Sequence, residues 1–310
     1  MPRIGKEILD AAFYLYGSEE EARAGQNMGG TGFLVSYIHT HEVNRDPYVY
    51  AVTNWHVAVR DGFSVVRLNC HDGTTDTFDF DPSEWQFIPG GPDVAAVRIA
   101  PDPLKHKSAA IPLSSFVSRN RHPYDLEVDT GEDVFMVGRF MDHDGGEVNV
   151  PAVRFGNISV MPTLMQVGEL THPQQYYCID MHSRTGFSGS LVVAYRTLGS
   201  DLSGKDARIL YDEVVNAVKR GMTPDLWPYW GLLGIHCGQF MEQMELKADK
   251  ETARKYVIGM SGMTLVAPAW DIEDTLNLPK LQEERCALDA DKAAARKKLY
   301  LSAQKPKNGQ

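Results

Sequence analysis

The apolar positions of the chain form many short runs that are separated by turn-forming residues. From residue 30 onward, Gly, Pro, Asp and Asn divide apolar stretches at 32–35, 49–53, 63–68, 94–99, 133–137, 152–155, 176–179, 191–194, 232–235 and 263–266. Runs of this length and spacing predict the strands of a β-sandwich or barrel. Alternating βαβ units would instead place long helical patterns between the strands. The pattern therefore predicts an all-β fold.

Helical patterns flank and interrupt these short runs. Residues 4–24 place apolar side chains at helical spacing, and the tail that begins at Leu276 does the same before a Lys-rich end. Residues 206–220 predict an amphipathic helix that a glycine and a proline end, and residues 239–259 have helical composition. We therefore expect terminal helices and helical insertions around the β-rich part of the chain.

The two groups of apolar runs divide the chain into expected parts. A polar, proline-bearing stretch between the groups predicts a connector rather than a further strand. The expected parts are an N-terminal helical extension at 1–28, a first β-barrel at 29–110, a connector at 111–130, a second β-barrel at 131–275 with a helical insertion at 198–229, and a C-terminal helix with a frayed tail at 276–310.

The composition excludes several classes of protein. The formal net charge of −10, from 31 basic and 41 acidic residues, argues against a nucleic-acid-binding protein. Hydrophobic residues make up 43% of the chain and charged residues 23%, as in ordinary globular domains. No apolar run approaches the roughly 18 residues of a membrane-spanning helix, and the first residues lack the apolar core of a secretory signal. We expect a cytoplasmic protein that binds neither membranes nor nucleic acid.

The cysteines argue against a disulfide framework and against a metal site. Cys70, Cys178, Cys237 and Cys286 are dispersed, and no CxxC pair offers the ligand spacing of a zinc ribbon or a redox motif. We predict free thiols in a reducing compartment. His39 and His41 could be combined with Cys70 and His71 as a metal site, but their spacing suits a surface hairpin better. We therefore expect neither a metal nor an organic cofactor.

Three segments place reactive side chains beside predicted strands. His56 ends an apolar run in TNWHV, Asp93 begins another in PDVAAV, and Ser188 lies in the glycine-flanked turn TGFSGS. A serine hydroxyl becomes a nucleophile when a neighbouring base takes its proton, and a carboxylate must orient that base. Gly186 lets its own backbone N–H and that of Ser188 converge on a developing oxyanion. These residue types together predict nucleophilic catalysis.

These segments resemble, in their order along the chain, the motifs of bacterial trypsin/chymotrypsin-like serine endopeptidases. GTGFLV at 30–35 is similar to the opening strand of that family, and TNWHV, PDVAAV and GFSGS are similar to its histidine, aspartate and nucleophile motifs. The resemblance covers about residues 29–275 and excludes the insertions and both termini. It implies two six-stranded antiparallel β-barrels of the chymotrypsin type, with the active site in the cleft between them.

The same resemblance implies a role for each residue of the three motifs. His56 would act first as general base and then as general acid, Asp93 would orient it, and Ser188 would be the nucleophile. The backbone N–H groups of Gly186 and Ser188 would form the oxyanion hole. The reaction would be the hydrolysis of a protein or peptide substrate through an acyl-enzyme, without a cofactor.

A fourth motif bears on the choice of substrate. LGIHCG at 233–238 resembles the strand of glutamyl endopeptidases, and of viral chymotrypsin-like proteases that cleave after Glu or Gln, whose histidine lines the S1 pocket. This resemblance implies that His236 and Ser183 contact the P1 side chain, with His182 on the same pocket wall. Because an imidazole and a hydroxyl donate hydrogen bonds to carboxylate or carboxamide oxygens, we expect Glu or Gln at P1.

Other interpretations of these residues stay open. Taken singly, His56 also fits a core histidine, Asp93 a turn residue, Ser188 a tight-turn serine and His236 an ordinary strand residue. An α/β-hydrolase is disfavoured because its G-x-S-x-G elbow requires Gly at position 190, which is Ser here. Two rival functions stand beside the peptidase. One is a catalytically silent module that only binds, and the other is a regulated module of a bacterial stress or defence system, which contacts a protein partner through the C-terminal helix or the insertions.

Overall fold

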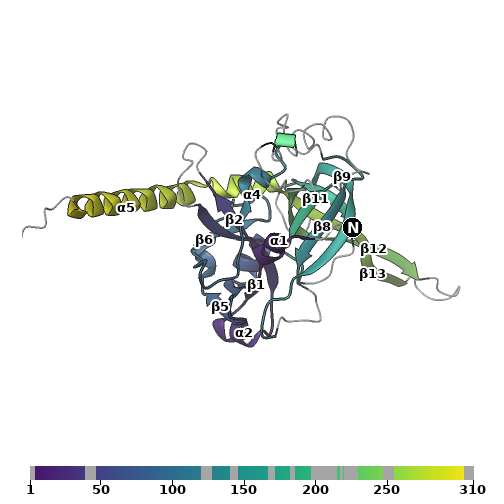
Figure 1. Ribbon diagram of the computed structural model, residues 1–310. Coiled ribbons are helices and arrows are strands. Elements are labelled where there is room, and N and C mark those ends of the chain that lie inside the picture. Colours follow the sequence, from purple (N-terminus) through teal and green to yellow (C-terminus); the bar gives the residue numbers. More distant parts are fainter. Residues whose placement is uncertain are drawn as a thin grey trace, which may run out of the picture.

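Two β units make up most of the computed structural model (Figure 1), which describes residues 4–38, 47–119, 128–139, 146–166, 172–181, 186–196, 215–216, 219, 230–246 and 255–303. The first unit is a sheet with the strand order β5-β4-β1-β2-β3-β6. Its strands are β1 (Ala12–Tyr16), β2 (Gly30–Tyr37), β3 (Tyr48–Thr53), β4 (Val65–Asn69), β5 (Thr75–Phe78) and β6 (Ala95–Ile99). Neighbours along this path are antiparallel. The short β7 (Ile111–Pro112) pairs parallel with β2.

The second unit is a closed barrel with the strand order β10-β13-β12-β11-β8-β9. Its strands are β8 (Asp133–Gly138), β9 (Ala152–Met165), β10 (Gln174–Asp180), β11 (Leu191–Tyr195), β12 (Trp230–Leu246) and β13 (Lys255–Pro268). The predicted all-β class, with two β units and terminal helices, is confirmed. The first unit differs in detail, because its described strands form an open path of six with β7 added.

Few helices accompany the two β units in the described residues. They are α1 (Lys6–Ala11), α2 (Glu19–Ala24), α4 (Ala269–Leu276), α5 (Pro279–Ala303) and the short turns η1 (His56–Arg60), η2 (Pro82–Glu84) and η3 (Leu113–Ser115). The predicted C-terminal helix is confirmed by α5, and α4 starts the helical part earlier than expected. No described helix has the length and apolar character that crossing a membrane requires.

The single helix expected at 4–24 is wrong, because β1 separates two short helices there. The run AFYLY is buried at every position and pairs with β2 on one side and β4 on the other. Aromatic residues favour a strand that is covered on both faces, and this packing outweighs the helical spacing of the flanking residues. The first β unit therefore begins before residue 29, with β1 at the centre of its sheet.

The helical insertion expected at 239–259 is also wrong where the structure describes it, because residues 239–246 and 255–259 belong to the paired strands β12 and β13. Strands β12 and β13 pair from Gly234 opposite Pro268 to Leu246 opposite Lys255, with register shifts near His236 and Met241. The ladder continues out of the barrel wall (Figure 1), so pairing overrides the weak helical preference of Met, Glu and Gln. Nearly all of the helix predicted at 206–220, and of the insertion at 198–229, lies outside the described residues.

One core joins the two β units. Phe33 and Tyr50 of the first sheet belong to the same cluster of buried side chains as Phe135 and Leu191 of the barrel. Leu276 of α4 completes the same cluster. The predicted free thiols are confirmed, because none of the four cysteines, all within the described residues, forms a disulfide. The units are therefore held together by apolar burial rather than by covalent links.

A buried arginine anchors helix α5 to the first sheet. Arg285 is 1% exposed, and its Nη1 donates hydrogen bonds to the Tyr50 hydroxyl at 2.8 Å and to the Leu276 carbonyl at 2.9 Å. Its guanidinium lies 4.1 Å from the centre of the Tyr37 ring. The outer part of α5 runs away from both β units (Figure 1).

We predict that Arg285→Ala lowers the free energy of unfolding by about 2–4 kcal/mol, because it removes buried packing, a cation–π contact and two hydrogen bonds. Urea unfolding measures this change. Arg23→Ala is the matched control, since the exposed pair of Arg23 with Glu19 at 3.1 Å is expected to contribute less than about 0.5 kcal/mol. Equal losses in the two variants would contradict the anchoring role.

Candidate active site

Antiparallel pairing brings His56 and Asp93 together at one end of the first sheet. Strands β3 and β6 are neighbours, and Thr53 lies opposite Ala95. Because the strands run in opposite directions, the residues just after Thr53 and just before Ala95 emerge at the same edge. His56 begins the turn η1 three residues after Thr53, and Asp93 precedes β6. The register of two strands therefore positions both side chains.

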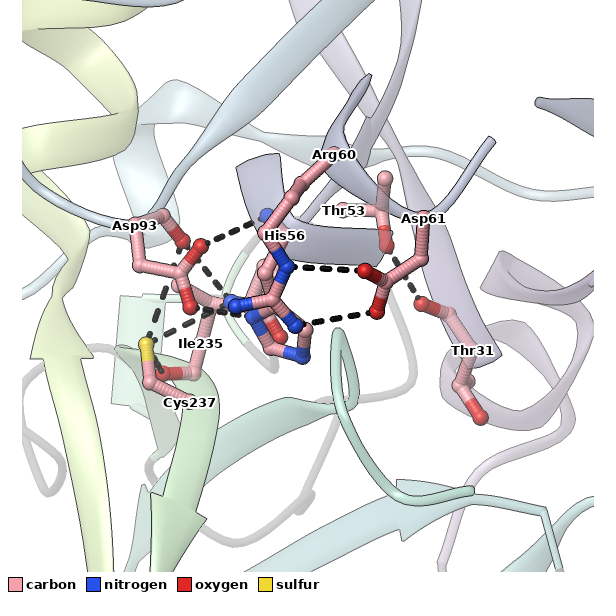
Figure 2. A network of polar contacts seen from close by, with 9 residues as sticks. Thr31, Thr53, His56, Arg60, Asp61, Asp93, Ile235 and Cys237 are labelled. Atoms are coloured by element: carbon pink, nitrogen blue, oxygen red, sulfur yellow. Dashed lines mark hydrogen bonds and ion pairs between the residues drawn. The ribbon is translucent and has the colours of Figure 1, made fainter. Parts of the chain in front are cut away.

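Asp93 holds His56 through two hydrogen bonds (Figure 2). One carboxylate oxygen accepts from the His56 backbone N–H at 2.9 Å, and the other lies 2.6 Å from the imidazole Nδ1. Asn54 also holds Asp93 in place, because its Nδ2 donates a hydrogen bond to the Asp93 backbone carbonyl at 2.8 Å. The Asp93 side chain is 11% exposed and that of His56 is 20% exposed. Solvent and substrate can therefore reach the imidazole.

This pairing fixes which nitrogen of His56 carries the hydrogen. A carboxylate can only accept hydrogen bonds, so Nδ1 must be the donor to Asp93. The other nitrogen, Nε2, is then the acceptor in the neutral ring and is able to take a proton. Asp93 also stabilises the imidazolium that such a transfer creates. The arrangement holds the imidazole in one tautomer, with Nε2 available to accept a proton.

The turn that carries Ser188 is held in shape by glycines and by backbone hydrogen bonds. Gly186 and Gly189 have φ values of 91° and 84°, which L side chains rarely adopt. The Ser190 N–H donates to the Phe187 carbonyl at 3.0 Å, and the Gly189 N–H donates to the His236 carbonyl at 3.0 Å. A side chain at Gly189 would lie 1.8 Å from the Thr31 carbonyl, so only glycine fits there.

Phe187 anchors this turn in the barrel. Its side chain is fully buried in a cluster with Val192 and Leu233, and the Arg154 guanidinium lies 5.0 Å from its ring centre. Ser188, the next residue, is partly exposed. A buried aromatic next to a partly exposed serine holds the serine at the surface of a rigid turn.

The structure brings Ser188 and His56 into the same region without a direct bond. A side chain at Gly30 would lie 2.6 Å from Val57, which follows His56, and 3.3 Å from the Ser188 carbonyl. Within the described residues, no hydrogen bond joins the Ser188 hydroxyl to the His56 ring. Such bonds are often long in free enzymes and tighten when substrate binds.

His236 lies on the strand beside the Ser188 turn. Its backbone N–H donates to the Ser190 carbonyl at 2.9 Å, so β12 runs directly alongside the turn. Its side chain is only 2% exposed. Burial, reinforced by the nearby His56, lowers the pKa of His236 to about 4, so the ring is neutral at pH 7. Ser183 and His182, which were expected to share its pocket, lie outside the described residues.

Cys237 lies beside Asn54 and the backbone of Asp93. Its sulfur lies 3.3 Å from Asn54 Nδ2, and desolvation, together with the charge of Asp93, raises the pKa of this thiol well above its usual range. A protonated thiol is a poor nucleophile, so Cys237 has a supporting position. Sequence analysis assigned no role to Asn54 or Thr31, although both lie inside the TNWHV and GTGFLV motifs.

A metal centre has no ligands in the part of the chain that the structure describes. No group of three or more His, Cys, Asp or Glu side chains there could hold an ion.

Several solved structures that resemble this chain are described as proteases. The apo protease domain of MamO from Magnetospirillum magneticum has 16% identity and a TM-score of 0.46, and the match covers 86% of this chain and 96% of that chain. The inactive form of the Rv3671c protease has 13% identity and a TM-score of 0.42, covering 87% and 88%. The HtrA-type protease AlgW with a decapeptide has 14% identity and a TM-score of 0.44, covering 88% and 66%. No protein-family model and no curated protein matches the chain.

We predict that His236 makes the protein less stable in acid. Its folded-state pKa of about 4 is below the ordinary value of 6.5, so the unfolded chain binds the extra proton first. The contribution of the neutral His236 to the free energy of unfolding is fully present above pH 6.5 and is lost as the pH falls towards 4. Relative to His236→Gln, the wild type should lose about 2–3 kcal/mol between pH 7.5 and pH 4.5. Urea unfolding at a series of pH values measures this, and parallel curves for the two proteins would contradict it.

Proposed function

We propose that this protein is a serine endopeptidase in which His56, Asp93 and Ser188 form a catalytic triad. The observation that carries the proposal is the double hydrogen bond of Asp93 to the His56 backbone and ring. A buried carboxylate that fixes one imidazole tautomer is what a serine hydroxyl needs in a neighbouring base. The rigid, glycine-bounded turn of Ser188 supports the same role for the hydroxyl.

The reaction follows from these groups. His56 Nε2 takes the Ser188 proton while Oγ attacks the substrate carbonyl, and the N–H groups of Gly186 and Ser188 stabilise the resulting oxyanion. The imidazolium then gives its proton to the leaving amine, which breaks the peptide bond and leaves an acyl-enzyme. Water, deprotonated by His56, releases the acid product and restores the serine.

A second candidate is a silent or regulated module that acts through protein partners in a bacterial stress or defence system. It is supported by the exposed part of α5, residues 290–295, which offers a surface outside the β units. We propose α5 or the insertion at 198–229 as the partner surface. The free cysteines suit a reducing compartment such as the cytoplasm.

We predict that Ser188→Ala abolishes peptide hydrolysis and labelling by a fluorophosphonate probe, with a loss of at least ~10⁴-fold, because triad members act as a unit. Labelling followed by peptide mapping identifies the modified serine. Ser114→Ala makes the same chemical change at an exposed serine and should keep full activity. A folded wild type that the probe does not label would favour the silent module.

We further propose that the enzyme prefers Gln, and then Glu, at P1, with His236, Ser183 and His182 in the S1 pocket. Support comes from the place of His236 beside the Ser188 turn and from its neutral ring. A neutral imidazole has a single N–H, which here bonds the Phe187 backbone, so a P1 carboxamide oxygen would take the place of that backbone group as its acceptor. His236 is only 2% exposed, and a P1 side chain must reach its ring if His236 lines the pocket. Substitution of His236 therefore tests the pocket directly.

We predict that kcat/KM for P1 Gln exceeds that for P1 Leu or Lys by about 10²-fold or more, since a site of buried donors rejects partners that lack an acceptor. His236→Ala should reduce cleavage after Gln much more than it reduces labelling by a small fluorophosphonate. The preference for Gln over Glu should stay constant between pH 6 and pH 8, because His236 stays neutral there. A preference for basic P1 residues would contradict the pocket and leave the triad intact.

A further inference from the structure

Thr31, a residue of the first sheet, contacts the Ser188 turn of the barrel at two points. Its backbone N–H donates to the Ser188 carbonyl at 2.8 Å, and its hydroxyl donates to the Gly186 carbonyl at 2.9 Å. Thr31 is fully buried. One residue of β2 therefore binds the turn on both sides of the peptide unit that carries the Ser188 N–H.

The direction of the Thr31 hydroxyl is fixed by a third contact. The Arg139 backbone N–H, just after β8, lies 3.2 Å from the same hydroxyl oxygen. An N–H can only donate, so the hydroxyl accepts there and directs its own hydrogen to Gly186. The Thr31 carbonyl in turn accepts from the Thr53 hydroxyl at 2.7 Å (Figure 2). Thr31 is thus held from both β units.

These bonds restrain the two peptide units on either side of the one that carries the Ser188 N–H. In a planar trans peptide the C=O and the N–H point in opposite directions, so fixing a carbonyl also fixes the following N–H. Thr31 binds the carbonyls of Gly186 and Ser188 and so fixes the N–H groups of Phe187 and Gly189, while the Ser190 N–H binds the Phe187 carbonyl and so fixes the Ser188 N–H between them. Gly186 has a φ of 91°, a conformation that glycine adopts readily.

We propose that Thr31 is a positioning residue, which holds both neighbours of the peptide unit that carries the Ser188 N–H and so keeps that N–H directed at the oxyanion. The proposal rests on the peptidase function proposed above. It assigns to the GTGFLV strand a role in the chemistry, although no atom of Thr31 needs to touch the substrate. Its effect on rate comes from geometry, since small displacements of catalytic groups cost large factors.

The test compares Thr31→Val, which keeps the shape and removes the hydroxyl, with Thr31→Ser, which keeps the hydroxyl. Thr31→Val should lower kcat by about 10–100-fold with KM within about 3-fold, and Thr31→Ser should restore most of the rate. The apparent pKa values of the pH–rate profile should not move, because His56 and Asp93 are unchanged. Where Thr31→Val folds poorly, Thr31→Cys, a weak donor of similar size, should show the same pattern with a smaller loss.

A matched control separates positioning from general stability. Thr275→Val removes another fully buried threonine hydroxyl, which donates to the Asp271 carbonyl at 2.8 Å within α4. It should lower the melting temperature and leave kcat unchanged. A second readout needs no activity: amide hydrogen exchange at 186–190 should accelerate in Thr31→Val and stay slow in Thr275→Val.

The outcomes distinguish this inference from the proposed function. A folded Thr31→Val enzyme with kcat within about 2-fold of wild type, or equal losses in Thr275→Val, would overturn the positioning role. A wild type without hydrolysis or labelling would overturn the peptidase, and the exchange experiment would still decide whether Thr31 holds the turn. Unchanged amide hydrogen exchange at 186–190 in Thr31→Val would show that Thr31 does not restrain the Ser188 turn.

Discussion

The contact between strand β2 and the Ser188 turn is the constraint on which the site depends. His56 and Asp93 belong to the first sheet and Ser188 to the barrel, so no local sequence pattern can place all three. The Thr31 N–H and hydroxyl span the two units at 2.8 Å and 2.9 Å, and Gly189 gives the backbone room to approach. Any shift of one unit relative to the other has to break these buried bonds, whose unmet partners cost free energy.

The rest of the architecture supports that contact. The apolar cluster that includes Tyr50, Phe135 and Leu276 crosses from the first sheet through the barrel to α4, so the units cannot slide without exposing apolar surface. The closed barrel gives β11 and β12 partners on both sides, which keeps His236 alongside the turn. Beside the ionisable pair of His56 and Asp93, the neighbouring His236 is neutral and the Cys237 thiol is protonated at neutral pH.

The two β units could be predicted from the sequence, because short strands and the turns between them leave a local signal. The pairing of His56 with Asp93 followed from the resemblance of their motifs to those of a peptidase family, since each residue taken singly also fits a structural role. Strand β1 could not be predicted, since its helical flanks carry the stronger pattern and only contact with β2 and β4 reveals the strand. The strand residues 239–246 and 255–259 were missed for the same reason, because pairing rather than composition decides their structure. The roles of Thr31 and Asn54 depend on partners 155 and 39 residues away, and no spacing rule connects such positions.

Helix α5 extends away from the β units and presents its exposed surface at a distance from them. It is fixed at Arg285, which is locked between Tyr37, Tyr50 and Leu276. At about 1.5 Å per residue, the stretch from Arg285 to Ala303 spans roughly 27 Å, comparable to the width of a small domain. A partner or label attached at its outer end would be held away from both β units. A partner bound at the outer end of α5 would therefore leave access to the site unchanged.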